Sequence, residues 1–302
     1  MPAKALSFPL VPRRRFVGLS YGAMHSARRG MGSDSAGSRP YRRGDDMDTI
    51  DWAASAKLSS ARGGDEFVVR EYYADEAPRA VLLCDHRPSM ALYGAPLPWL
   101  SKCEAMDVAA WLIALSVMDV RGFLGALDYA EGGEWWEPPR SRIDLVRFRD
   151  PRPFRAPSDS LTTAFWRLAD HRRALPAGTF VFVLSDFLDA PDAGTWARAL
   201  QHRWDVVPVV IQDPVWEQSF PDVAGVVLRL ADPTTGRAQL VRLSRRDVEE
   251  RRAANECRFA ELLNGFETLD LDPVVLSSSA SEDVLECFVA WSDRRLFRRG
   301  HL

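Results

Sequence analysis

The chain has 302 residues, of which 46% are hydrophobic, so it is long enough to bury one large core or two modest ones. Its formal net charge is −3 and its pI is near 6.0, which excludes the strong basic excess of a general nucleic-acid binder. Four cysteines without a Cys-x-x-Cys spacing predict reduced, mostly buried thiols in a cytoplasmic protein.

The first ten residues do not resemble a secretory signal, because Pro2, Lys4 and Pro9 interrupt their short apolar stretch. The longest apolar run in the chain, Val108–Met118, is shorter than the roughly 20 residues that a membrane-spanning helix needs. We therefore expect a soluble, cytoplasmic protein without a membrane span.

Residues 1–78 are rich in Gly, Ser and Arg and show little helical periodicity. Within them, Phe67–Tyr73 is β-branched and aromatic, which favours a strand. We predict an irregular, β-rich N-terminal module over residues 1–78, followed by a second domain over residues 79–302.

Residues 39–52 form a dense charge cluster, with four carboxylates and three arginines in fourteen residues. Taken as an ordinary loop, this segment predicts a turn followed by a helix. Asp48 or Thr49 would then be the helix N-cap, and Ile50 and Trp52 would reach the core.

From Arg79 onward, short apolar runs alternate with longer amphipathic segments, as in βαβ units that build a mostly parallel sheet. The predicted strands are Ala80–Cys84, Gly122–Leu127, Thr179–Leu184, Asp205–Ile211 and Thr268–Leu271. The predicted helices are Ser101–Met118, Ser160–Arg173, Asp192–His202, Arg245–Leu263 and Glu282–Phe297. A turn-forming segment between Val223–Leu230 and Ala238–Leu243 predicts a β-hairpin.

Residues 132–158 are predicted to form a long loop, because five prolines interrupt any regular pattern there. Trp135 and Trp136 fall in this segment. Paired tryptophans in an exposed loop are typical of an interaction surface, whereas a loop folded over the sheet edge would bury both rings. The sequence leaves these two interpretations open.

The charge cluster and the segments that follow it resemble a known family. The matching residues of its R-x-Y-x-x-G-D-D-x-R-x-I-D-W signature and the alanine that follows are Arg39, Tyr41, Gly44, Asp45, Asp46, Ile50, Asp51, Trp52 and Ala56. The family is known as the bacterial domain of unknown function fifty-eight, and its members carry a von Willebrand factor A-like domain behind the signature. Asp48 departs from the pattern, because the family usually has arginine there. The resemblance implies an α/β, Rossmann-type fold with a mostly parallel sheet flanked by helices.

Two acids, Asp85 and Asp186, follow predicted strands, and ligands of open α/β sheets bind beyond the carboxyl ends of the strands. Von Willebrand-type domains use such acids in a metal-ion-dependent adhesion site. Mapped onto that pattern, the candidate ligands for a Mg²⁺ ion are Asp85, Ser89, Thr162 or Thr163, and Asp186.

Arg87 stands where that motif has its first serine, so a cation replaces a ligand oxygen. An arginine beside two carboxylates neutralises them without a metal. A pseudo-site held by Arg87 therefore competes with a Mg²⁺ site, and we expect weak Mg²⁺ binding or none.

No P-loop, G-x-S-x-G or G-x-G-x-x-G motif occurs in the sequence, and its five histidines lack metal-ligand spacing. The resemblance instead implies a protein–protein interaction module, an adaptor or co-chaperone of a MoxR-type AAA+ ATPase that acts on an unknown client protein. The signature residues would brace the carboxyl edge of the sheet or contact the ATPase. The alternative is a metal-dependent hydrolase that uses clustered aspartates, which must converge within a few ångströms. The candidate carboxylates are Asp45, Asp46, Asp48, Asp51 and Asp85.

Overall fold

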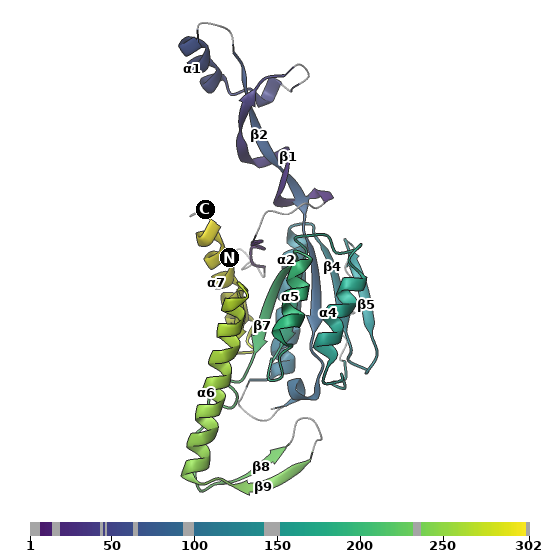
Figure 1. Ribbon diagram of the computed structural model, residues 1–302, viewed down its shortest axis with the longest axis vertical. Coiled ribbons are helices and arrows are strands. Elements are labelled where there is room, and N and C mark those ends of the chain that lie inside the picture. Colours follow the sequence, from purple (N-terminus) through teal and green to yellow (C-terminus); the bar gives the residue numbers. More distant parts are fainter. Residues whose placement is uncertain are drawn as a thin grey trace, which may run out of the picture.

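The computed structural model describes residues 7–13, 19–42, 45, 47–62, 66–92, 100–141, 152–231 and 237–299. Gly44 and Asp46 of the signature lie outside these residues. An α/β body lies at the centre of the molecule, with a slender arm at one end and a helix and hairpin extending from the other (Figure 1).

The described body is built around a six-stranded sheet in the order β10-β7-β6-β3-β4-β5. Its strands are β3 (Arg79–Cys84), β4 (Phe123–Asp128), β5 (Trp135–Arg140), β6 (Phe180–Ser185), β7 (Asp205–Ile211) and β10 (Val274–Leu276). β5 is antiparallel to β4, and all other neighbours are parallel. Every residue of β6 and β7 is buried, as expected for parallel strands covered on both faces. The predicted mixed α/β fold with a mainly parallel sheet is confirmed.

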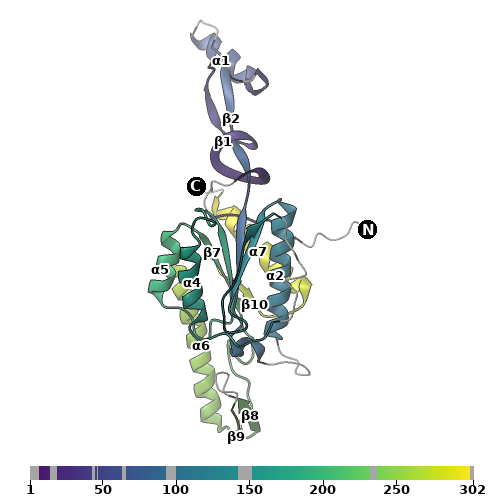
Figure 2. The same cartoon turned by 90° about the vertical axis from the view of Figure 1, so that its right-hand side faces the viewer.

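Helices cover both faces of the sheet (Figure 2). One face packs against α2 (Lys102–Asp119) and α7 (Ser281–Arg299), and the other against α4 (Ser160–Asp170), α5 (Ala193–Gln201) and the C-terminal part of α6 (Arg245–Thr268). Successive β3 side chains point to opposite cores, as the period of a strand requires. No helix among the described residues is long and apolar enough to cross a bilayer.

The opening residues pack on the body rather than on the arm. The Phe8 ring stacks on Phe288 of α7 with centroids 4.5 Å apart. Further along, Ser292 Oγ donates to the Pro9 carbonyl at 2.6 Å, and Arg295 Nη1 donates to the Val11 carbonyl at 3.0 Å. Residues Phe8–Val11 therefore form a strap that ties the chain start to α7.

The arm consists of β1 (Leu19–Pro40) paired antiparallel with β2 (Val68–Ala77), and it carries α1 (Trp52–Arg62) at its far end (Figures 1 and 2). Since β2 leads directly into β3, the arm leaves the body at the amino ends of the parallel strands. The strand predicted at residues 67–73 is confirmed within β2.

The helix that follows the signature begins where the sequence predicts it, but its details differ. Asp51, rather than Asp48 or Thr49, caps α1, since its Oδ1 accepts from the Ala54 amide at 3.0 Å. Trp52 is 59% exposed, so the prediction that it reaches a core is wrong. A two-stranded arm has no second layer under which this ring could be buried.

The opposite end of the molecule carries the predicted hairpin, which is confirmed as β8 (Val227–Ala231) and β9 (Ala238–Arg242). It follows β7 and precedes α6, so it extends from the carboxyl edge of the sheet together with the N-terminal half of that helix (Figure 1).

Two sequence predictions about the body are also wrong. Residues 268–271 are not a strand, because α6 continues to Thr268 and the chain then turns at Asp270 with φ +55°; the outer strand of the sheet is β10. Residues 135–140 are not a loop but the edge strand β5, where Pro138 and Pro139 are tolerated. Both tryptophans of β5 are half-buried.

Candidate functional site

The candidate site lies where the strand order of the sheet reverses. β3 leads to α2 on one face, and its neighbour β6 leads to α5 on the other, so the two connections diverge between these strands. Asp85 and Asp186 directly follow the two strands, and the Asp85 amide donates to the Leu184 carbonyl at 2.9 Å. The structure therefore brings both acids to one crevice, where they are 1% and 0% exposed.

Arg87 holds Asp85 in a buried, charged pair. Its Nε lies 2.9 Å from Asp85 Oδ2 and 3.0 Å from Oδ1, and its Nη2 lies 2.7 Å from Oδ2. Ser185 Oγ donates to the same Oδ2 at 2.7 Å, and Arg87 Nη1 donates to the Asp189 carbonyl at 2.8 Å. Every part of the guanidinium thus has an acceptor supplied by the chain itself.

Burial by itself lowers the pKa of Arg87, but the hydrogen bonds and the charge of Asp85 outweigh burial and raise the pKa above its ordinary value. The guanidinium is therefore fixed in its charged form beside Asp85.

The second acid, Asp186, pairs with a different cation, Lys102, which was not predicted from the sequence. Lys102, at the first turn of α2, is fully buried, and its Nζ lies 2.9 Å from Asp186 Oδ2 and 2.6 Å from Glu217 Oε1. Glu217 lies after β7, and its Oε2 accepts from the Asp213 amide at 2.9 Å. Burial raises the pKa of Glu217, although Lys102 opposes this shift. Lys102, Asp186 and Glu217 lie far apart along the chain. In the sequence, only the lysine at the start of a predicted apolar helix indicates this network.

The three candidate hydroxyl ligands lie on other elements. Ser89 is in the short 3₁₀ helix Pro88–Ala91, and Thr162 and Thr163 are half-buried on α4. The hydroxyl bonded to Asp85 is that of Ser185.

The crevice does not fit a divalent cation. Mg²⁺ requires several hard oxygen ligands and retains part of its hydration shell. Here a guanidinium and an ammonium already bind the two carboxylates and occupy the oxygens that a metal ion would need. Among the residues that the structure describes, no group of three or more His, Cys, Asp or Glu side chains is arranged to hold a metal ion.

Two carboxylates of the signature, Asp45 and Asp51, lie in the arm and are paired there. Asp45 accepts two hydrogen bonds of 2.7 Å from Arg39, and this pairing is the largest cause that lowers the Asp45 pKa to about 2. Asp51 accepts from Arg70 Nε at 2.8 Å. The extended segment of residues 68–84, seventeen residues or roughly 50 Å long, leads from the tip of the arm to Asp85. The structure therefore does not bring Asp85 to these acids (Figure 1).

The tip of the arm also carries a group of exposed apolar side chains, which we call the tip cluster: Tyr41, Met47, Trp52 and Phe67. Their exposed fractions are 38%, 65%, 59% and 43%, in that order. The Phe67 ring lies 6.4 Å from Tyr41 and 6.0 Å from Trp52 in edge-on contacts.

Two solved structures resemble the chain at 14% sequence identity. One is the conserved hypothetical protein BatB from Bacteroides thetaiotaomicron, with a TM-score of 0.37, covering 72% of this chain and 99% of that chain. The other is an aerotolerance-related membrane protein from Bacteroides fragilis, with a TM-score of 0.39, covering 70% and 98%. No curated protein matches the sequence.

A family model described as "Protein of unknown function DUF58" matches residues 37–259. This range begins just before the signature, contains every strand of the sheet except β10 and ends within α6, and it is well over half of the 302 residues. The chain therefore belongs to the DUF58 family of proteins of unknown function.

Proposed function

We propose that this protein is a protein–protein interaction module, an adaptor or co-chaperone that works in the cytoplasm with a MoxR-type AAA+ ATPase and an unknown client. The observation that carries the proposal is the tip cluster. The aromatic residues of the signature lie exposed on a projecting arm instead of in a core.

Several features of the tip cluster favour a docking surface. Large contiguous patches of exposed apolar side chains are uncommon on monomeric proteins, and tryptophan and tyrosine are enriched among the residues that dominate binding energy. Two arginines beside the cluster, Arg39 and Arg70, are paired with Asp45 and Asp51 of the same arm. The identity of the partner rests on the family resemblance alone.

We further propose that the body is a von Willebrand factor A-like domain with a degenerate metal-ion-dependent adhesion site. The reversal of strand order between β3 and β6, with an aspartate after each strand, supports this assignment. Arg87 and Lys102 then take the place of the divalent cation, and partner binding needs no metal.

The alternative of a metal-dependent hydrolase receives no support from the geometry. Asp45 and Asp51 pair with arginines in the arm, Asp48 is exposed there, and Asp85 lies at the opposite edge of the body. Asp46 lies outside the described residues.

The proposal is tested by co-purification of the tagged protein from a native lysate, with mass spectrometry of the recovered proteins. We expect an AAA+ ATPase of the MoxR type, recovered equally with and without EDTA. Trp52→Ser should reduce its recovery at least tenfold. The matched control is Trp166→Ser, since Trp166 on α4 is exposed to a similar extent, 53%, but lies on the body. Repeated absence of such an ATPase, or equal losses in both variants, would count against the proposal.

A further inference from the structure

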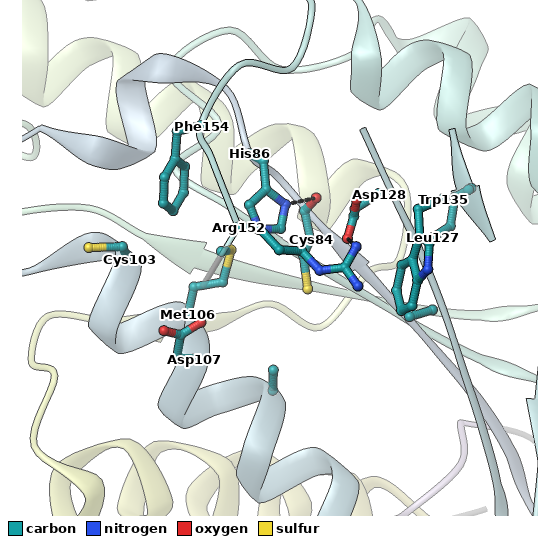
Figure 3. Close-up of a pocket in the computed structure, with 12 residues that line it drawn as sticks. Cys84, His86, Cys103, Met106, Asp107, Leu127, Asp128, Trp135, Arg152 and Phe154 are labelled. Carbon is teal, nitrogen blue, oxygen red and sulfur yellow. Dashed lines mark hydrogen bonds and ion pairs between the residues drawn. The ribbon is translucent and has the colours of Figure 1, made fainter. Parts of the chain in front are cut away.

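A cavity of about 230 Å³ lies beside the candidate site but is distinct from it (Figure 3). It is formed at the carboxyl ends of β3 and β4, on the face covered by α2, whereas the Asp85–Asp186 crevice lies between β3 and β6. The start of β5 and the segment 152–154 line further sides of it.

Most of the cavity wall is apolar and aromatic. Met106 and Ala110 line it from α2 and Ala126 lines it from β4. The Trp135 ring lines it from β5, and the Phe154 ring from the segment 152–154. Protein interiors rarely keep voids larger than a water molecule. An apolar cavity of about 150 Å³ is large enough to bind benzene, so the larger cavity here has room for a ring system of one or two fused cycles.

The strongest charges beside the cavity are already committed. Arg152 Nη1 lies 2.7 Å from Asp128 Oδ2, and the guanidinium carbon lies 3.6 Å from the centre of the Trp135 ring. Figure 3 shows this Arg152–Asp128 pair against the indole of Trp135. Asp107 also lines the cavity, from an exposed position on α2. An anionic ligand would therefore find a neutralised arginine and a nearby carboxylate, and a charged ligand of either sign would lose hydration in an apolar space.

A further side of the cavity is a tilted pair of rings, His86 and Phe154. The His86 ring lies 5.1 Å from Phe154, and its Nδ1 lies 3.3 Å from the Cys84 carbonyl oxygen, which accepts the hydrogen bond and orients the imidazole. Flat surfaces thus border the cavity from two elements, as a planar ligand requires.

We propose that this cavity is a binding site for an uncharged aromatic ring of one or two fused cycles, held between Trp135, Phe154 and the apolar side chains of α2. The ring belongs either to a free small molecule or to an aromatic side chain of a protein partner. The site is independent of the tip cluster and of the proposed ATPase.

Indole is the probe, titrated into the full chain by calorimetry. We expect binding of one indole per chain, and at least tenfold weaker binding of indole-3-acetate because of its charge. Since Cys103 lines the cavity and Cys257 is exposed on α6, iodoacetamide labelling followed by mass spectrometry gives a second readout. Saturating indole should slow the labelling of Cys103 severalfold and leave that of Cys257 unchanged. Absence of both effects overturns the proposal.

Variants locate the binding. Ala110→Leu fills the cavity and should weaken indole binding at least tenfold, whereas Ala253→Leu, the same change on the exposed face of α6, should not alter it. If Ala110→Leu does not fold, Trp135→Leu at the half-buried sheet edge removes a wall and should have the same effect. Wild-type affinity in a folded cavity variant would refute the assignment.

N-acetyltryptophanamide distinguishes the two sources of the ring. Binding at least as tight as that of indole indicates a cavity that accepts a partner's side chain, while binding of indole alone indicates a free small molecule. Failure of both probes contradicts the proposal in either form.

Discussion

Arg87 and Lys102 supply the positive charges of the candidate site from within the chain. Both side chains are buried, and each pairs with an aspartate that directly follows a strand. A buried ion pair contributes little net stability compared with apolar side chains of the same volume, but the loss of one partner leaves an uncompensated charge and is strongly destabilising. The two cations thus balance the negative charges at this edge without a metal.

Lys102→Met removes one partner of the buried ion pairs and should destabilise the fold, and the loss of stability should depend on pH. Without the ammonium, burial raises the pKa of Glu217 further above its ordinary value. When the pKa of a carboxyl is higher in the folded than in the unfolded chain, the unfolded chain loses its proton first as pH rises. The fold therefore becomes less stable between the unfolded pKa and the folded pKa. We expect a loss of about 3–5 kcal/mol near neutral pH and a smaller loss near pH 5, measured by urea denaturation.

The matched control is Lys57→Met, which removes an exposed lysine of α1 and should change the free energy of unfolding by less than about 0.5 kcal/mol at either pH. A cost of Lys102→Met that stays constant between the two pH values would show that Glu217 does not carry the effect.

Arg87→Ser should convert the pseudo-site toward a cation site. The change supplies the hydroxyl that the proposed von Willebrand-type site requires at this position and releases Asp85, with Ser185 already bonded to it. We expect calorimetry to show Mg²⁺ binding at least tenfold tighter than in the wild type, and Asp85→Ala in the same background should abolish it. Micromolar Mg²⁺ binding by the wild type would contradict the role assigned to Arg87.

Among the elements, the long periodic segments were predicted well from the sequence, and the errors fall at the edges of the sheet. Four of the five predicted body strands and all five predicted helices occur near their expected positions. β5 was missed because Pro138 and Pro139 argue against a strand, and only its place at an edge removes the need for their hydrogen-bond donors. Edge position is a property of the assembled sheet, so local sequence could not provide it.

The same reasoning applies to the site. Asp85 and Asp186 follow apolar strands and were predicted from that pattern, and the competition from Arg87 was recognised because it lies only two residues from Asp85. Lys102 and Glu217 were not recognised, because the Lys102–Asp186 contact spans 84 residues and the Lys102–Glu217 contact spans 115. Only tertiary packing brings them together.

The β4–β5 pairing makes a specific demand on Gly125. A Cβ atom there would lie 2.6 Å from the Glu137 carbonyl oxygen and 2.7 Å from the Pro139 nitrogen, both backbone atoms of the neighbouring strand. Gly125→Ala should therefore push β5 away and cost about 1–3 kcal/mol, measured by urea denaturation. Gly133→Ala in the same hairpin is the control, since no heavy atom lies within 4 Å of its added Cβ, and it should cost much less. Equal effects of the two changes would show that the strands separate freely.

At the scale of the whole molecule, the arm and the body are structurally distinct. The two main apolar cores draw on the sheet, its helices and the opening strap, and they contain no described side chain of β1, α1 or β2. The strap matters for any dissection of the protein, because Phe8 and Leu10 belong to the core beneath α7. The arm leaves from the amino ends of the strands, while the candidate site and the cavity lie at the carboxyl ends. The signature therefore does not brace the carboxyl edge, and the two ends are free to bind different partners.

Replacement of residues 19–77 by a flexible linker of about ten Gly and Ser residues, with a mean span of about 17 Å, tests this separation. The strap stays attached, so we expect the body to unfold in one cooperative transition with a melting temperature within about 5 °C of the full chain. Calorimetric binding of indole at the cavity should be retained, while recovery of the ATPase should be lost together with the tip cluster. Deletion of the strap as well is the control, and it should destabilise the body by removing Phe8 from its stack on Phe288. A body that unfolds without its arm would mean that β1 and β2 stabilise the sheet, and retention of the ATPase would transfer its docking surface from the arm to the body.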